Sequence, residues 1–335
     1  MKAVIIVKPH HIICKNVPDP IPGPDELLLR PKACGVCGTD VHILEGNFIG
    51  HYPVIPCHEF AAEVVDLGEA VEGFEPGDSV AVDPNIRCGE CRFCRTGRAN
   101  ICEYYQAIGV TRPGGFAELV SVPVRNCHRV LTRDARNTAF AEPLACVLYG
   151  QGRLDFTYSE EVIIWGAGAI GLLHALVCIS LHHKKVTVID KNTDRLKKAM
   201  DLAAIETMPG GHNVREKLDA LRHGGWEIAI EATGSIEAAG EMFNHLGRCG
   251  QALLFGVYPR NERVTISPFD IFLNDWRITG SFTYRDEFSE AVRLLDAGKI
   301  NAEPLVDISV SLEETPDVLE DLASGKRIGK VQVLQ

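Results

Sequence analysis

Three residue types that bind zinc are gathered in the segment 34–59. Cys37 supplies a thiol, His58 an imidazole and Glu59 a carboxylate, and glycines lie between the first two. Zinc sites that carry out catalysis use three protein ligands of these kinds and keep one coordination position open for the substrate. The segment therefore predicts a catalytic zinc site.

A second group consists of cysteines alone. Cys88, Cys91, Cys94 and Cys102 place four thiols within fifteen residues, which is the ligand set of a closed structural zinc site. An iron–sulfur cluster is the alternative, but the last gap holds seven residues and no proline follows Cys102. Disulfides are disfavoured, because the thiols of a chain without a secretory signal are expected to stay reduced.

A third group is a glycine turn between two strand patterns. Three glycines in the spacing Gly-x-Gly-x-x-Gly begin at Gly166, directly after an apolar run, and an apolar helical pattern follows them. The next strand pattern, 185–189, ends at Asp190. Strand, glycine turn, helix, strand and acidic residue in this order are typical of a dinucleotide site.

Each part of this motif has a physical role in dinucleotide binding. The first glycine permits the tight turn, the second lets the backbone approach the pyrophosphate, and the third lets helix and strand pack closely. The helix N-terminus offers N–H groups to phosphate. Asp190 is expected to accept hydrogen bonds from the ribose and to repel a 2′-phosphate, which favours NAD over NADP, although the neighbouring Lys191 weakens this preference. The predicted cofactor-binding residues are Gly166, Gly168, Ala169, Ile170, Gly171, Asp190 and Arg195.

Length, composition and charge set the class of protein. The chain has 335 residues, of which 46% are apolar and 24% charged, as in a globular protein of two domains. A net charge of −11 disfavours nucleic-acid binding. The longest apolar run, 162–181, contains three glycines and His174, so it is a poor membrane span. We expect a cytoplasmic protein that binds neither nucleic acid nor membrane.

The pattern of predicted secondary structure that positions these residues changes near Glu161. Before it, short strand patterns are separated by glycine and proline turns, which favours a small barrel-like β domain. After it, strands and helices alternate, which favours an α/β domain with a doubly wound parallel sheet. The last strand pattern, 330–334, is expected to rejoin the first domain.

Together these motifs resemble the zinc-containing medium-chain dehydrogenase/reductase family over essentially the whole chain. The resemblance is closest to its polyol branch, which includes sorbitol-like and arabinitol-like dehydrogenases. It implies a GroES-like catalytic domain at 1–147, completed by 286–335, and a Rossmann NAD-binding domain at 148–285. The motifs that carry it are Cys37-Gly-Thr-Asp-Val-His42, Pro56-Cys-His58-Glu59, the cysteines at 88–102, Asp83-Pro-Asn-Ile, Gly109-Val-Thr, Gly114-Gly-Phe-Ala-Glu, Glu142-Pro143 and the glycines from Gly166 to Gly171.

The resemblance also implies ligands for the catalytic zinc. Cys37 and His58 match two of the family's ligands. The third ligand differs within the family: in the polyol branch it is the residue matched by Glu59, and elsewhere it is the one matched by Glu142. Both stay candidates, and we expect Glu59 to be the ligand and Glu142 an alternating or water-bridged partner.

A proton relay follows from the same resemblance. Thr39 and His42 match a hydroxyl and an imidazole that pass the substrate proton to solvent by way of the cofactor ribose. The alternative for His42 is a surface side chain near a turn.

The chain departs from the family pattern at positions near the metal and the substrate. Cys57 stands where a glycine usually precedes His58, and it is either a packed thiol or a competing ligand. Thr283 stands where the sorbitol enzymes carry an arginine before the aromatic residue matched by Tyr284. Because that arginine would hold polyol hydroxyls, sorbitol itself is not the expected substrate.

The expected function is oxidation of a secondary alcohol of a polyol to a ketose, with hydride transfer to NAD and zinc as Lewis acid. One alternative is a dehydrogenase of an amino alcohol, sugar acid or sugar phosphate, and Arg112 or Arg285 would favour an anionic substrate. A second is a catalytically idle nucleotide-binding protein on the same fold. The resemblance further implies a homodimer or homotetramer that pairs through the edge strand of the nucleotide-binding sheet, expected at 276–282.

Overall fold

The computed structural model describes residues 1–48, 50–211, 214–222, 224–326 and 329–335. The chain divides into two compact units. Unit 1 comprises Met1–Ala145 and Arg285–Gln335, and unit 2 comprises Cys146–Tyr284. The domain boundaries expected from the sequence, after 147 and after 285, lie beside these.

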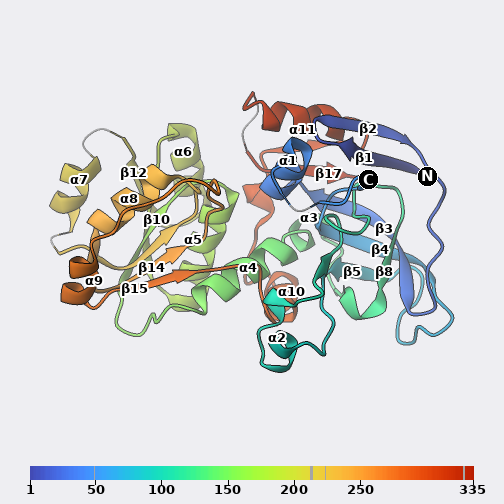
Figure 1. Ribbon diagram of the computed structural model, residues 1–335, viewed down its shortest axis with the longest axis horizontal. Helices are drawn as coiled ribbons and strands as arrows, with labels where there is room; N and C mark the ends of the chain where they lie inside the picture. Colours follow the sequence, from blue (N-terminus) through green and yellow to red (C-terminus); the bar gives the residue numbers. More distant parts are fainter. Residues whose placement is uncertain (49, 212–213, 223, 327–328) are drawn as a thin grey trace. The chain divides into compact units, whose positions relative to one another are not determined.

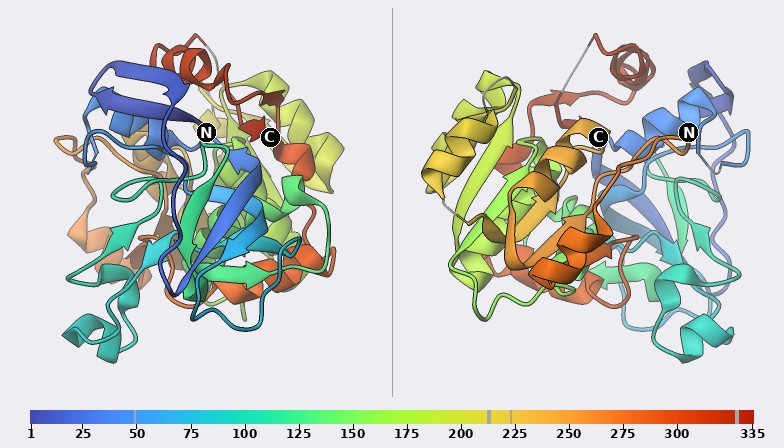
Figure 2. Two further views of the ribbon diagram at one scale, coloured as in Figure 1. Left: turned by 90° about the vertical axis from the view of Figure 1, so that its right-hand side faces the viewer. Right: turned by 60° about the vertical axis from the view of Figure 1, so that its left-hand side comes forward.

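The described part of unit 1 is built around a seven-stranded sheet in which β3 (Glu26–Gly35) pairs with β4, β8 and β17. Leu27, Leu29 and Ala33 alternate with more exposed residues along β3, so one face of the strand packs on the core. Figures 1 and 2 show β17, in red, near the blue strands of the N-terminal segment. The other strands are β4 (Glu59–Leu67), β5 (Ser79–Val82), β8 (Val120–Pro123), β9 (Cys127–Arg129), β16 (Ile308–Val310) and β17 (Val331–Leu334).

Smaller elements complete unit 1. Strands β1 (Lys2–Lys8) and β2 (His11–Asn16) form an antiparallel hairpin, and β6 (Asn85–Ile86) pairs with β7 (Gln106–Ala107). Between β6 and β7 the cysteine lobe, residues 88–102, projects from the sheet and carries α2 (Arg92–Arg95) (Figure 2). The other helices are α1 (Gly38–Glu45), α3 (Ala135–Thr138), α10 (Phe288–Asp296) and α11 (Thr315–Ala323), and α4 (Ala141–Gln151) runs from unit 1 into unit 2.

The described part of unit 2 contains a six-stranded parallel sheet in the order β12-β11-β10-β13-β14-β15. The strand order reverses between β10 and β13, and in doubly wound sheets nucleotides bind beyond the carboxyl ends of the strands at such a switch point. The strands are β10 (Glu161–Trp165), β11 (Lys185–Asp190), β12 (Ile205–Pro209), β13 (Trp226–Glu231), β14 (Leu246–Leu254) and β15 (Arg277–Gly280).

Helices pack against the strands of this sheet (Figure 1). They are α5 (Ala169–His182), α6 (Thr193–Leu202), α7 (Val214–Leu221), α8 (Ile236–Asn244) and α9 (Pro268–Asn274). Side-chain caps fix where several begin: Asn192 accepts from two N–H groups of α6, and Ser235 and Ser267 each accept from one at α8 and α9. In the parts of the chain that the structure describes, no helix is long and apolar enough to cross a membrane.

The fold class predicted from the sequence is confirmed, and β17 rejoins unit 1 as expected. The apolar pattern predicts a helix from Ala145 to Leu154, and this is wrong about its start, because α4 begins at Ala141 and places Glu142 in its first turn. The alternative interpretation of His42 placed it near a turn, and this was wrong, because His42 lies in helix α1. The edge strand β15 is shorter than the predicted 276–282.

Candidate active site

The ends of strands β3 and β4 bring the predicted metal ligands together. Gly35 at the end of β3 is in register with Glu59 at the start of β4, and Cys37 and His58 lie just outside this pair. The ligand atoms of Cys37, His58 and Glu59 all lie within 4.8 Å of one another. A thiol, an imidazole and a carboxylate at this separation fit one zinc ion.

Asp40 organises this group from the first turn of α1. Its fully buried carboxylate accepts hydrogen bonds from the N–H of Cys37 at 2.9 Å and from the N–H of Cys57 at 3.2 Å. Its Oδ1 lies 3.8 Å from Nδ1 of His58. Burial raises the pKa of Asp40, while the neighbouring imidazole and N–H donors oppose that shift. Asp40 therefore fixes both chain segments that carry the ligands.

His58 is buried among negative groups. Burial lowers the pKa of its imidazole, but Cys37, Asp40 and Glu142 raise it more, so the pKa lies well above its ordinary value. Among the described residues, its Nδ1 has no hydrogen-bond partner. An imidazole held beside the acidic side chains of Asp40 and Glu142, with an unpaired nitrogen among the described residues, indicates a site that attracts a cation.

Glu59 forms a buried ion pair with Lys330, which comes from the far end of the chain. The Lys330 ammonium donates to Glu59 Oε2 and to the carbonyl of Val36 at 3.0 Å. Burial raises the pKa of Glu59, but the charge of Lys330 lowers it more, and the pKa lies below its ordinary value. Gly35 makes room for the pair, since a Cβ there would lie 2.2 Å from Glu59 Oε2.

The other predicted residues of the catalytic site lie around this group. Glu142 is half-buried and outside the set of mutually close ligand atoms found among the described residues. Thr39 and His42 are three residues apart on α1 and so share one face of it. His42 has a side chain 41% exposed, and its Nδ1 lies 3.4 Å from Glu45 Oε2.

Cys57 is a packed thiol and is not part of the ligand group found among the described residues. Its φ of 82° is left-handed, a conformation that glycine adopts without strain, and this agrees with the glycine that the family resemblance implies at this position. Burial and the nearby Cys34 raise the pKa of its thiol well above the ordinary value. A buried, protonated thiol is a poor metal ligand.

The four cysteines of the lobe converge on one point. Their sulfur atoms lie within 4.8 Å of one another. Backbone N–H groups point at the sulfurs, with Cys91 N 3.3 Å from Cys88 Sγ and Cys94 N 3.5 Å from Cys91 Sγ. The Cys94 N–H, followed by that of Glu103, lowers the pKa of Cys91 to about 6. Four thiols with donors that stabilise thiolate fit a structural zinc.

The glycine turn of unit 2 has the geometry of a phosphate-binding loop. Gly166 has a φ of 110°, and a Cβ on Gly171 would lie 1.8 Å from the Gly166 carbonyl oxygen, so both positions require glycine. Gly168 has nothing within 4 Å of a Cβ, and among the described residues no side chain caps α5 there. The first N–H groups of α5 are thus available to a phosphate.

Asp190 connects the end of β11 to this turn. Its Oδ2 accepts from the N–H of Ala167 at 2.7 Å and its Oδ1 accepts from the N–H of Asn192 at 2.8 Å. Arg195 Nη1 lies 3.8 Å from the same carboxylate. Ala169 and Ile170, also predicted, form the first turn of α5.

The two arginines considered for an anionic substrate are both engaged. Arg112 Nη2 lies 3.1 Å from Glu26 Oε1, and Glu26 also accepts from Ser121. The backbone N–H of Arg285 donates to Glu287 Oε2 at 2.8 Å, and Arg285 has at least one further interaction. Nothing in these contacts favours an anionic substrate.

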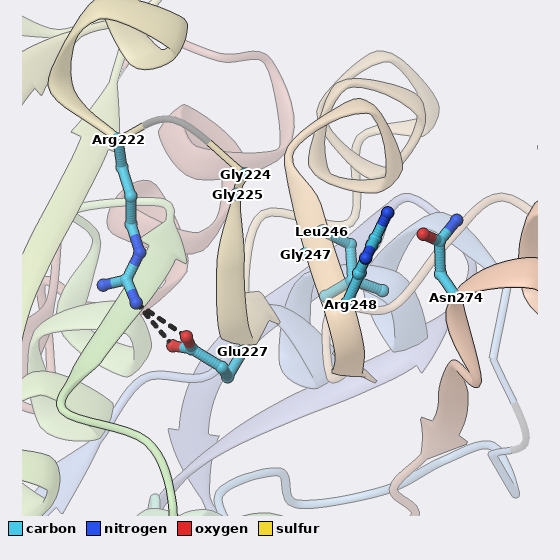
Figure 3. A pocket seen from close by; sticks show the side chains of 8 residues that line it. All are labelled: Arg222, Gly224, Gly225, Glu227, Leu246, Gly247, Arg248 and Asn274. Carbon is cyan, nitrogen blue, oxygen red and sulfur yellow. Dashed lines mark hydrogen bonds and ion pairs between the residues drawn. The ribbon is translucent and has the colours of Figure 1, made fainter.

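A hollow of about 390 Å³ lies in unit 2, and Figure 3 shows the side chains that line it. Its wall includes the residues before β13 and at the start of β14, that is, the amino ends of these strands. Arg222, which lines it, is paired with Glu161 and Glu227. It is therefore separate from the dinucleotide edge.

Asp40 and Lys330 are the site residues that sequence reasoning missed. Asp40 lies inside the Cys37–His42 motif, and its position three residues after a helix-starting cysteine was a usable signal. Lys330 lies 271 residues from Glu59, and no local pattern indicates that contact.

Comparison with known proteins identifies the family. The alcohol dehydrogenase GroES-like domain matches residues 23–132, and the zinc-binding dehydrogenase domain matches residues 169–297. D-arabinitol dehydrogenase 1 from Uromyces fabae is 32% identical over 97% of this chain and 94% of its own length. D-altritol 5-dehydrogenase from Agrobacterium fabrum is 35% identical over 88% of each chain.

A solved structure shares the fold throughout. A Sinorhizobium meliloti protein assigned to the zinc-binding dehydrogenases, with NADP bound, has a TM-score of 0.94 and 36% identity over 100% of this chain and 99% of its own. The chain belongs to the zinc-binding alcohol dehydrogenase family. Within that family it falls in the polyol dehydrogenase branch, and it is a zinc-dependent alcohol dehydrogenase.

Proposed function

We propose that this protein oxidises a secondary alcohol of a polyol to a ketose, with zinc in unit 1 and NAD in unit 2. The observation that carries the proposal is the convergence of Cys37, His58 and Glu59, whose ligand atoms lie within 4.8 Å of one another. The named activities of the relatives, on D-arabinitol and D-altritol, support a polyol as the substrate class.

Cys37, His58 and Glu59 are the proposed ligands of the catalytic zinc, and Cys88, Cys91, Cys94 and Cys102 those of the structural zinc. When bound, catalytic zinc supplies a Lewis acid that lowers the pKa of an alcohol hydroxyl. Glu142, whose charge acts on His58, is proposed as the alternating carboxylate partner.

Thr39 and His42 are proposed to move the proton that the alcohol loses. The Thr39 hydroxyl accepts it, because a hydroxyl has both a donor and acceptor sites. His42 lies on the same face of α1 and is partly open to solvent, so its imidazole is suited to release the proton.

Asp190 supports NAD rather than NADP as the cofactor. It is half-buried beside the glycine turn, and the ribose of the cofactor would meet its carboxylate, which repels a 2′-phosphate. Lys191 and Arg195 are the groups that would favour NADP. Lys191, however, is paired with Glu237 at 2.7 Å, and Arg195 lies 3.8 Å from Asp190 itself.

The test is the initial rate of NADH formation across a panel of polyols, amino alcohols, sugar acids and sugar phosphates, each with NAD and with NADP. We expect turnover of one or more uncharged polyols, preference for NAD, and loss of activity after chelation of zinc. Turnover confined to threonine-like or phosphorylated substrates would replace the polyol proposal. Preference for NADP would overturn the role given to Asp190.

A further inference from the structure

The carboxylate of Glu231 is a hydrogen-bond hub at the carboxyl edge of the sheet in unit 2. Glu231 is the last residue of β13 and is fully buried. Its Oε1 accepts from the N–H of Thr233 at 2.7 Å and from the Thr233 hydroxyl. Its Oε2 accepts from the N–H of Gly234 at 3.1 Å and from the hydroxyl of Tyr258 at 2.5 Å. All four groups are donors, as expected around an ionised carboxylate.

Main-chain hydrogen bonds at Glu231 and Ala232 connect the end of β13 to the ends of β14 and β10. Its carbonyl accepts from the N–H of Phe255 at 2.9 Å and from the N–H of Gly256 at 3.0 Å, just after β14. The next residue, Ala232, donates to the carbonyl of Trp165 at 2.9 Å, at the end of β10. Backbone hydrogen bonds therefore connect the segments that follow β10, β13 and β14 at the carboxyl edge of the sheet.

These segments also touch one another directly. A Cβ on Gly256 would lie 2.1 Å from Gly234 N and 2.7 Å from Glu231 Oε2, so only glycine fits there. A Cβ on Gly166 would lie 2.9 Å from Cγ2 of Thr233. The turn that Glu231 holds thus rests against the first glycine of the dinucleotide motif.

Tyr258 secures the segment after β14 to this hub. The segment 255–267 forms no helix or strand. Within it, the side chain of Tyr258 donates a hydrogen bond from its hydroxyl to the Glu231 carboxylate. Burial and the Glu231 carboxylate both raise the pKa of Tyr258, so the hydroxyl stays protonated and donates. The Tyr258 ring is half-buried, which fits a role inside the protein rather than at the surface.

We propose that Tyr258 is a positioning residue for the dinucleotide, acting through Glu231 to hold the Thr233–Gly234 turn against Gly166. The reason is location: these groups line the switch point between β10 and β13, where doubly wound sheets bind nucleotides. The inference rests on the proposed function, in which unit 2 binds NAD. This role does not require contact between Tyr258 and the cofactor.

Tyr258→Phe tests this role, because it removes the hydroxyl and keeps the ring. The dissociation constant of NADH, followed by its fluorescence, is expected to rise roughly tenfold, because the Glu231 carboxylate loses a hydrogen bond that helps to hold the Thr233–Gly234 turn. The KM for NAD should rise by a similar factor, while kcat at saturating NAD and the zinc content stay unchanged. Tyr158→Phe is the matched control, since Tyr158 is in the same unit and 89% exposed.

A double-mutant cycle with Glu231→Gln tests the route of the effect. If Tyr258 acts through Glu231, the two changes are non-additive in NADH affinity. Additive effects overturn that route, and unchanged NADH affinity in Tyr258→Phe overturns the positioning role, even if the variant melts at a lower temperature. Failure of the unaltered protein to bind NADH would instead contradict the proposed function.

Discussion

At the scale of residues, the candidate metal site depends on a charge balance that extends beyond its ligands. Asp40 and Glu59 are both buried carboxylates, and Lys330 is the buried cation that faces Glu59. A buried charge without a partner is costly, so the pair of Glu59 and Lys330 must be treated as one unit.

Lys330→Met should destabilise the protein strongly, because it leaves the Glu59 carboxylate buried without its cation. Breaking a buried pair costs about 3–5 kcal/mol in the free energy of unfolding. Urea unfolding of the protein without its catalytic zinc measures this loss, because a bound zinc would itself be a cation partner for the Glu59 carboxylate. The double variant Lys330→Met/Glu59→Gln should recover part of the loss. A double variant as unstable as the sum of the two single variants would show that the pair is not coupled.

At the scale of elements, the glycine turn was predictable and several short elements were not. The turn has a fixed spacing that backbone sterics demand, as the close approach of Gly171 to Gly166 demonstrates. Helix α1 was missed because it begins with Gly38 and contains Thr39 and Val41, which have low helix propensity. The Asp40 carboxylate holds it instead, through a local capping bond from the N–H of Cys37 and a tertiary bond from the N–H of Cys57.

Strand β12 and helices α9 and α11 were not predicted either. Strand β12, Ile205–Pro209, ends in a proline and carries little apolar alternation, and its place beside β11 comes from the sheet. Helix α9 has only seven residues, too few for a clear periodic pattern. Helix α11 contains a proline in its first turn and follows strand-like sequence.

Two glycine substitutions should separate folding from cofactor binding. A Cβ added at Gly168 has no other atom within 4 Å, and the φ of Gly168 is −72°. The free energy of unfolding of Gly168→Ala should therefore stay within about 0.5 kcal/mol of that of the unaltered protein. Its added methyl group faces the space where the pyrophosphate would approach, and NADH should bind at least about tenfold more weakly. Thermal unfolding and NADH titration give the two readouts. Normal NADH affinity would contradict the placement of the pyrophosphate.

Gly171→Ala is the paired variant with the opposite expectation. Its Cβ would lie 1.8 Å from the Gly166 carbonyl oxygen, a backbone atom that cannot move away easily. The helix α5 must shift on β10, so unfolding should occur at a clearly lower temperature, by several degrees for each kcal/mol lost. Stability equal to that of Gly168→Ala would contradict the close helix–strand packing.

His174 on α5 should make the protein acid-sensitive. It is fully buried, its Nδ1 lies 3.1 Å from Gln151 Nε2, and burial lowers its pKa to about 3. Between its unfolded pKa of about 6.5 and 3, only the unfolded chain binds this proton, so stability falls as pH falls through that window. His174→Asn, which keeps an acceptor for Gln151, should reduce the pH slope of the unfolding free energy by up to about one proton. An unchanged slope would contradict this assignment.

At the scale of the whole molecule, the sheet of unit 2 ends in an exposed strand beside exposed apolar side chains. Strand β15 is the edge strand, and Phe269, Phe272 and Leu273 of α9 are 64%, 80% and 62% exposed. Edge strands and apolar patches of this kind are sites of association. We propose that two copies of the chain pair here, as a homodimer or within a homotetramer.

Phe272→Glu should weaken that association, because it places a charge in the proposed contact. Light scattering after size-exclusion chromatography should show a smaller species for this variant than for the unaltered protein. Leu131→Glu, at a residue 88% exposed in unit 1, is the control and should leave the mass unchanged. A monomeric unaltered protein would contradict the proposal.

The general architecture and the grouping of Cys88, Cys91, Cys94 and Cys102 were predictable because they depend on local spacing. The contacts that shape the site were not, because Lys330 meets Glu59 and Tyr258 meets Glu231 only after distant strands have paired. We propose that two zinc sites of different kinds lie in unit 1. The direct measurement is zinc content per chain, together with alcohol turnover and NADH binding, for the unaltered protein, Cys37→Ser and Cys91→Ser.

We expect Cys37→Ser to lose one zinc and its turnover while keeping its stability and its affinity for NADH. Cys91→Ser should lose the other zinc and, with it, stability in the cysteine lobe. A Cys37→Ser variant that keeps both its full zinc content and its turnover would contradict the assignment of the catalytic metal site.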